Sequence, residues 1–174
     1  KARKQLTEIA KKDEPFNYTI LTVDTHFEDG YLDESCKKKF KDQYSNVIYC
    51  ADSQVNKFIK WIENQDFYEN TTIVLVGDHL SMDTDYFNEN GNYIRTTYNA
   101  IINSKTEPLN TKNRQFTSLD MFPTTLAALG AKIEGDRLAL GTNLYSNKKS
   151  GWFKPSAFIV FWRFRQNSNL RPSL

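Results

Sequence analysis

The sequence predicts an α/β domain in which a largely parallel sheet is flanked by helices. Apolar residues recur at helical spacing in residues 47–62, and β-branched and aliphatic residues fill residues 71–76. Strand-like and helical segments also alternate along the chain, which is typical of layered α/β domains. The length of 174 residues suits one domain, and a chain of this size buries about 70% of its unfolded surface. With 39% hydrophobic residues, we expect a packed core and exclude wholesale disorder.

The first elements we expect are a helix, a strand and a loop. Residues 1–13 carry an apolar stripe at helical spacing, and the helix should stop before Pro15 because residues that precede proline avoid the helical region. Residues 16–23 are rich in β-favouring side chains and predict a short strand. Residues 25–45 are polar, contain three consecutive lysines and predict an exposed loop.

The middle and the end of the chain give the clearest elements. Residues 47–62 form one continuous apolar face and predict a helix. Residues 71–76 have the composition and length of a buried central strand, which ends at Gly77. Another apolar strand is expected at residues 98–102. A final helix is expected at residues 123–129, because proline is well tolerated at a first helical position.

Charge divides the chain into a body and a tail. All 21 acidic side chains precede residue 148, whereas residues 148–174 contain only basic charges. We therefore expect a body at residues 1–147 and a basic tail of uncertain structure at residues 148–174, which is interpreted as a solvated extension rather than a phosphate-binding arm. The net charge of +2 argues against a nucleic-acid partner. No apolar run reaches the roughly 18 residues of a membrane span, so we expect any membrane attachment to lie outside this chain.

The two histidines of the chain each follow a predicted strand. Ligands gather at the carboxyl ends of strands in open α/β sheets, so His26 and His79 mark a candidate site. Asp78 and His79 offer a carboxylate and an imidazole, a pair that suits Mn²⁺ or Zn²⁺ if Gly77 breaks the strand. The alternative is a surface loop or a structural histidine.

His26 lies in a polar strand end, where its ring could hydrogen-bond a phosphate or sulfate oxygen. A solvent-exposed loop histidine is the alternative. Two ligands and one anion-binding histidine do not complete a site, because such metals usually have three or four protein ligands and covalent catalysis needs a nucleophile. The sequence offers no convincing third ligand and no activated serine or threonine.

The two cysteines leave two readings open. Cys36 and Cys50 are separated by 13 residues and do not form a CxxC metal pair. Outside the cytoplasm they could close a disulfide loop that stabilises the fold by roughly 3 kcal/mol. In a reducing compartment they would remain two ordinary thiols.

Four segments in one order carry a resemblance to a known family. TVDTHFEDGY at residues 22–31 resembles the substrate-histidine segment of bacterial phosphoglycerol transferases. TTIVLVGDH at residues 71–79 resembles the metal-binding strand end of the alkaline-phosphatase/sulfatase superfamily. SLDMFPTTLAALG at residues 118–130 and RLALGTNL at residues 137–144 are similar to later segments of these enzymes, the last of them to the osmoregulated-glucan type. Lipoteichoic-acid synthase is a more distant relative.

The resemblance implies an alkaline-phosphatase-like layered fold and a transfer reaction. Asp78 and His79 would be ligands of a divalent metal, most simply Mn²⁺, with Zn²⁺, Mg²⁺ and Ca²⁺ as alternatives. His26 would hold the phosphoglycerol moiety, and Cys36 and Cys50 match a pair in the glucan-type enzymes. The donor would be phosphatidylglycerol and the acceptor a cell-envelope glycan, at the extracytoplasmic (periplasmic) face of the bacterial membrane.

The resemblance also implies that this chain is a partial domain. In the family, the nucleophile and an acidic metal ligand precede the segments matched here, so residues 1–147 correspond to the C-terminal part of a sulfatase-like catalytic domain. We therefore expect the chain alone to be inactive without the N-terminal half. The alternatives are a sulfatase or phosphodiesterase-type hydrolase of the same superfamily, or a non-catalytic remnant.

Overall fold

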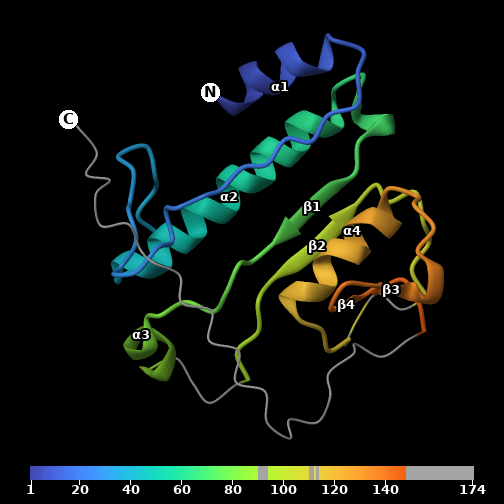
Figure 1. Cartoon of the computed structure of the whole chain (residues 1–174). Helices are drawn as coiled ribbons and strands as arrows, with labels where there is room; N and C mark the ends of the chain where they lie inside the picture. Colours follow the sequence, from blue (N-terminus) through green and yellow to red (C-terminus); the bar gives the residue numbers. More distant parts are fainter. Residues whose placement is uncertain (90–93, 110–111, 113, 148–174) are drawn as a thin grey trace, which may run out of the picture.

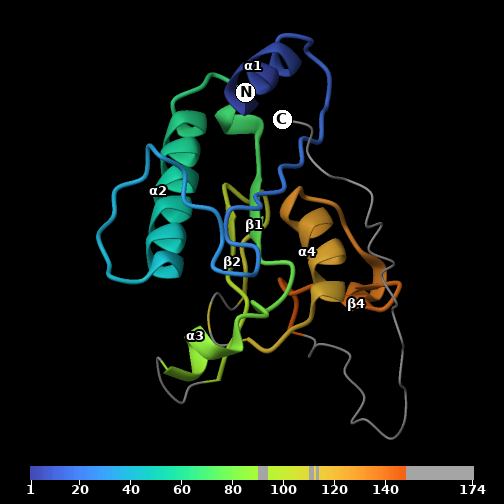
Figure 2. The same cartoon turned by 90° about the vertical axis from the view of Figure 1, so that its left-hand side faces the viewer.

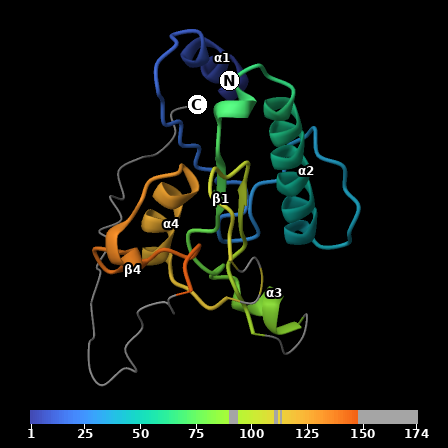
Figure 3. The same ribbon diagram turned by 90° about the vertical axis from the view of Figure 1, so that its right-hand side faces the viewer.

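A computed structural model describes residues 1–89, 94–109, 112 and 114–147, and the structural statements below concern these residues. The helices and strands follow one another along the chain in this order: α1 (Ala2–Ala10), α2 (Gln43–Glu63), η1 (Tyr68–Asn70), β1 (Ile73–Val76), α3 (Thr84–Glu89), β2 (Asn99–Ile102), η2 (Ser118–Asp120), α4 (Met121–Ala128), η3 (Glu134–Asp136), β3 (Arg137–Leu138) and β4 (Gly141–Thr142). The β1–β2 pair lies between α2 and α4 (Figures 1, 2 and 3). The basic tail predicted at residues 148–174 lies outside the described residues.

Helix α2 is the longest element and starts earlier than its apolar pattern predicts. The Asp42 carboxylate accepts a hydrogen bond from the backbone N–H of Ser45 at 2.7 Å and thereby caps the first turn. The buried side chain of Asn46 donates to the carbonyl oxygens of Phe40 and Asp42, and it accepts from the backbone N–H of Phe40. These contacts fasten the preceding loop to the helix and fix where the helix begins.

The sheet differs from the largely parallel sheet that the sequence predicts. Strand β1 pairs antiparallel with β2, in a register that joins Ile73 to Ile102 and Val76 to Asn99. Strands β3 and β4 form a second antiparallel pair. Within the described residues both sheets are therefore small and antiparallel.

The strand predicted at residues 16–23 is wrong for this structure. The segment is extended but belongs to neither sheet, and the side chain of Leu21 is 77% exposed. Among the described residues, no backbone–backbone hydrogen bond joins residues 16–22 to another segment. A β-favouring composition reflects how well side chains fit a sheet, and it produces a strand only where a neighbour supplies the ladder.

Helix α4 organises the end of the described chain. Ala127 and Ala128 pack with Tyr145, and Ile101 of β2 lies against this cluster. The hydroxyl of Thr124 donates to the carbonyl oxygen of Asp120 at 2.6 Å and accepts from the backbone N–H of Leu144 at 3.0 Å. Residues 141–147 therefore pack with α4 as one unit.

A disulfide joins Cys36 in the loop to Cys50 in α2, with 2.03 Å between the sulfur atoms. The bond ties the lysine-containing loop to the N-terminal half of the helix. Among the described residues, no helix combines the length and the apolar character needed to cross a membrane.

Candidate functional site

The site begins where strand β1 ends. The backbone N–H of Gly77 donates to the carbonyl oxygen of Tyr98 at 2.8 Å, which is the last ladder bond on this side. A Cβ atom at Gly77 would lie 3.3 Å from the Cβ atom of Thr97, so the two backbones approach closely here. The chain then leaves the sheet, and the side chains of Asp78 and His79 are exposed to solvent.

Asp78 and His79 face each other. Asp78 Oδ1 accepts a hydrogen bond from the backbone N–H of His79 at 2.9 Å, and Asp78 Oδ2 lies 3.4 Å from His79 Nε2. His79 Nδ1 lies 2.7 Å from the carbonyl oxygen of Leu80. Because a carbonyl oxygen only accepts, Nδ1 carries a proton, and Nε2 of the neutral ring then presents a lone pair to the carboxylate.

This arrangement fits a shared cation. Two lone-pair atoms that face each other repel unless a proton or a metal ion lies between them. Asp78 Oδ2 and His79 Nε2 are the carboxylate and imidazole donors that suit Zn²⁺ or Mn²⁺, and at 3.4 Å from each other they are close enough to contact one ion. In the described part of the chain, no third His, Cys, Asp or Glu side chain completes a metal-binding group with them.

His26 lies in a tight turn that follows the extended segment. Its backbone N–H donates to the carbonyl oxygen of Val23 at 3.0 Å, and its own carbonyl oxygen accepts from the N–H of Gly30 at 3.1 Å. His26 Nδ1 donates to the carbonyl oxygen of Phe27 at 2.6 Å. The Nε2 atom of His26 therefore accepts a hydrogen bond when the ring is neutral and donates one when it is protonated.

Gly30 allows the His26 turn to pack closely against helix α2. Gly30 has a φ of +62°, and a Cβ atom there would lie 2.5 Å from the carbonyl oxygen of Asp24 and 2.8 Å from Cγ1 of Val47. Val47 is a buried residue of α2. Only glycine combines this backbone conformation with such a close approach.

Two hollows flank His79. One of about 220 Å³ is lined by Asp78, His79 and Thr97, with Ser118 at the start of η2. The other, of about 170 Å³, is lined by His79 and Arg95. The guanidinium of Arg95 lies 4.4 Å from the ring centre of Phe87. Neither Thr97 nor Arg95 carries a sequence motif, and only the fold shows that they lie beside His79.

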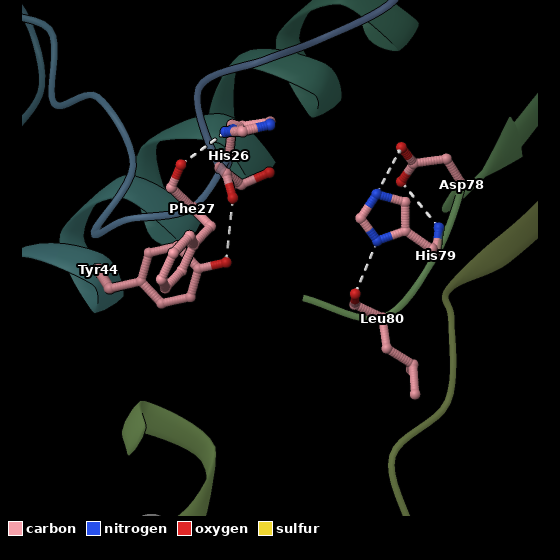
Figure 4. A network of polar contacts seen from close by, with 7 residues as sticks. His26, Phe27, Tyr44, Asp78, His79 and Leu80 are labelled. Carbon is pink, nitrogen blue, oxygen red and sulfur yellow. Dashed lines mark hydrogen bonds and ion pairs between the residues drawn. The ribbon is translucent and has the colours of Figure 1, made fainter. Parts of the chain in front are cut away.

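The hydroxyl of Tyr44 connects the two histidine segments. It contacts the carbonyl oxygen of Thr25 at 3.1 Å and Oγ of Ser81 at 2.9 Å. Figure 4 shows His26 and the Asp78–His79 pair as separate groups, with Tyr44 below His26. The structure thus places Asp78 and His79 together and holds His26 on a neighbouring segment through Tyr44.

Comparison with known proteins finds a matching family model and several relatives. The model of the sulfatase family matches residues 1–131. Proteins named phosphoglycerol transferase I from Citrobacter koseri and Escherichia fergusonii are each 32% identical over 87 residues, and that of Escherichia coli is 31% identical. The matched stretch covers 47% of this chain and 11% of each relative. No solved structure matches the chain significantly.

Proposed function

The chain belongs to the sulfatase family, and from this premise we propose that it is part of a metal-dependent phosphoglycerol transferase. The donor would be phosphatidylglycerol and the acceptor a cell-envelope glycan. The observation that carries the proposal is the facing pair of Asp78 Oδ2 and His79 Nε2, 3.4 Å apart. The similarity to proteins named phosphoglycerol transferase I supports transfer of glycerophosphate rather than another group.

Asp78 and His79 are the residues that would hold the metal, for which we propose Mn²⁺. A bound divalent ion supplies positive charge that polarises a phosphoryl oxygen and favours an alkoxide nucleophile. Hydrogen bonds within the chain orient both of these ligand side chains. The Leu80 carbonyl fixes the proton on Nδ1 of His79, and the backbone N–H of His79 orients the carboxylate of Asp78.

His26 would hold the transferred glycerophosphate group. Its ring position is set by the Phe27 carbonyl, which leaves Nε2 for the ligand. A protonated ring donates from Nε2 to a phosphate oxygen, whereas a neutral ring accepts from a glycerol hydroxyl. Both functional groups belong to glycerophosphate, so this one atom suits either end of the proposed substrate.

The nucleophile and a further acidic ligand would come from an N-terminal half of the catalytic domain. The matched stretch is 11% of the length of each phosphoglycerol transferase I relative, so those proteins contain much more chain. We propose that the whole protein works at the extracytoplasmic face of the bacterial membrane and that the present chain alone does not turn over substrate.

A hydrolase is the second candidate function, because the matching family model is that of the sulfatases. The metal ligands would be the same, and water would replace the glycan as the acceptor. A phosphodiesterase would differ from the transferase only in the acceptor of the covalently held group, whereas a sulfatase would also cleave a different ester.

The test uses the longer protein that contains this chain, with Mn²⁺ and labelled phosphatidylglycerol. Transfer predicts release of diacylglycerol together with labelled glycan, and hydrolysis predicts labelled glycerophosphate in solution. His79→Ala should abolish release of diacylglycerol. Full activity of that variant would overturn the ligand assignment. Cleavage of a sulfate ester in place of the lipid would favour the sulfatase alternative.

A further inference from the structure

One buried hydroxyl bridges the two halves of the candidate site. Tyr44 is only 4% exposed and lies in the first turns of α2. Because a carbonyl oxygen only accepts, the Tyr44 O–H donates to the Thr25 carbonyl, and the Ser81 hydroxyl then donates to the Tyr44 oxygen. Thr25 immediately precedes His26, and Ser81 lies two residues after His79.

Both ends of this bridge are held in place. The Tyr44 ring packs edge-to-face on Tyr86, with ring centres 5.0 Å apart. The Ser81 hydroxyl oxygen accepts from the backbone N–H of Asp83 at 3.2 Å, and the Ser81 carbonyl accepts from the guanidinium of Arg95. A phenylalanine would fill the same space as Tyr44, so packing alone does not account for a hydroxyl that bonds to both loops.

We propose that Tyr44 is a positioning residue, whose hydroxyl sets the separation between the His26 turn and the loop that carries Asp78 and His79. The inference rests on the proposed function, because the separation matters for a ligand that spans both groups. Glycerophosphate offers two such groups, a phosphoryl group for the metal pair and a glycerol end for His26. The bridge would keep the two contacts at a fixed distance before the ligand arrives.

The first arm of the test needs no metal. The chain contains two histidines, so its imidazole NMR signals report on the two loops separately. Tyr44→Phe should change the signals of both His26 and His79. Ser81→Ala should change His79 and leave His26 in place, because the bond from Tyr44 to Thr25 survives. Tyr44→Phe signals identical to the wild type at His26 would overturn the proposal.

Tyr86→Phe is the matched control. It also removes one tyrosine hydroxyl from the same aromatic cluster, and that hydroxyl lies 2.9 Å from Oγ of Ser45 in α2. The proposal predicts that neither histidine signal changes in Tyr86→Phe. If the histidine signals change equally in Tyr44→Phe and Tyr86→Phe, the cause is a general loosening of the aromatic cluster. The proposal that the Tyr44 hydroxyl positions the two loops would then be wrong.

The second arm tests the link to function with Mn²⁺. Bound Mn²⁺ broadens nearby proton signals, so the His26 ring should be broadened in the wild type and less broadened in Tyr44→Phe. We expect the Mn²⁺ affinity of Tyr44→Phe to fall by about tenfold, as for other residues that orient metal ligands. Unchanged broadening and affinity would overturn the positioning role. A wild-type chain that binds no Mn²⁺ would mean that Asp78 and His79 need the further ligand of the N-terminal half to bind the ion, and the metal-free spectra alone would then test the hydrogen-bond bridge through Tyr44.

Discussion

The carboxylate of Asp78 and the imidazole of His79 form a facing pair, with 3.4 Å between Oδ2 and Nε2. Because His79 Nδ1 donates to a carbonyl oxygen, Nε2 of the neutral ring presents a lone pair toward the carboxylate, and a proton or a metal ion can lie between the two atoms. Protons and metal ions therefore compete for the same position.

Removal of either member of this pair should weaken metal binding. We expect Asp78→Ala and His79→Ala each to raise the Kd for Mn²⁺ by at least about tenfold, since even residues that merely orient metal ligands contribute this much. Acidification should weaken binding in the wild type because protons displace the metal. Titration calorimetry measures both effects. His26→Ala is the control and should bind Mn²⁺ like the wild type; a comparable loss there would contradict the division of roles.

The cap of α2 predicts a pH-dependent stability. The backbone N–H of Ser45 lowers the pKa of Asp42 below its ordinary value of 3.8. A carboxyl whose pKa is lowered by folding stabilises the fold above its unfolded pKa, and this contribution is lost as the pH falls through the folded pKa. Asp42→Ala should lower the free energy of unfolding at pH 7 by about 1 kcal/mol in urea titrations.

Asp42→Asn separates the cap from the charge. Asparagine caps helices about as well as aspartate, so this variant should match the wild type at neutral pH. At acid pH it should keep a contribution that the wild type loses. Parallel pH profiles of the two proteins would show that the Asp42 charge plays no part.

The buried carboxylate of Asp120, the last residue of η2, joins the segment before α4 to β4. Its two oxygens accept from the backbone N–H groups of Thr142 at 2.7 Å and Thr117 at 2.8 Å. Asp120→Ala leaves these donors without that acceptor, and we expect the free energy of unfolding to fall by about 3 kcal/mol. Glu8→Ala is the control, because its exposed ion pair with Lys11 should contribute less than about 1 kcal/mol. Similar losses in both variants would contradict this account.

The disulfide between Cys36 and Cys50 predicts a reductant effect. The two residues are 14 positions apart, and closing a loop of about 15 residues stabilises a fold by about 3 kcal/mol. A reducing agent should therefore lower the melting temperature of the wild type. The double variant Cys36→Ser with Cys50→Ser should melt at the lower temperature with or without reductant. A reductant effect on that variant would point to a cause other than this bond.

Local patterns in the sequence predicted most of the helices. The apolar stripe at residues 47–62 lies within α2, and the proline-containing segment at residues 123–129 overlaps α4. The strand predicted at residues 71–76 contains β1. These elements depend on neighbouring residues, whose spacing the sequence displays directly.

Features that depend on distant partners could not be predicted. Residues 16–23 have the composition of a strand, but the described structure gives them no neighbour to pair with. The candidate site could likewise be predicted only where its residues are neighbours in the sequence. Asp78 and His79 are adjacent and were identified as a pair, whereas Tyr44 lies 37 positions from Ser81. No spacing rule connects residues that far apart, so the role of Tyr44 emerges only from the fold.

The contact between Gly30 and Val47 constrains what the sequence can tolerate. A side chain at position 30 would collide with the Asp24 carbonyl and with Val47, and it would also need a φ of +62°. In a library that samples all twenty amino acids at each position, position 30 should therefore tolerate only glycine. Leu21 is exposed and should accept many amino acids. The counts of surviving variants in such a library would therefore identify Gly30 as the position at which the His26 turn packs against α2, without a structure.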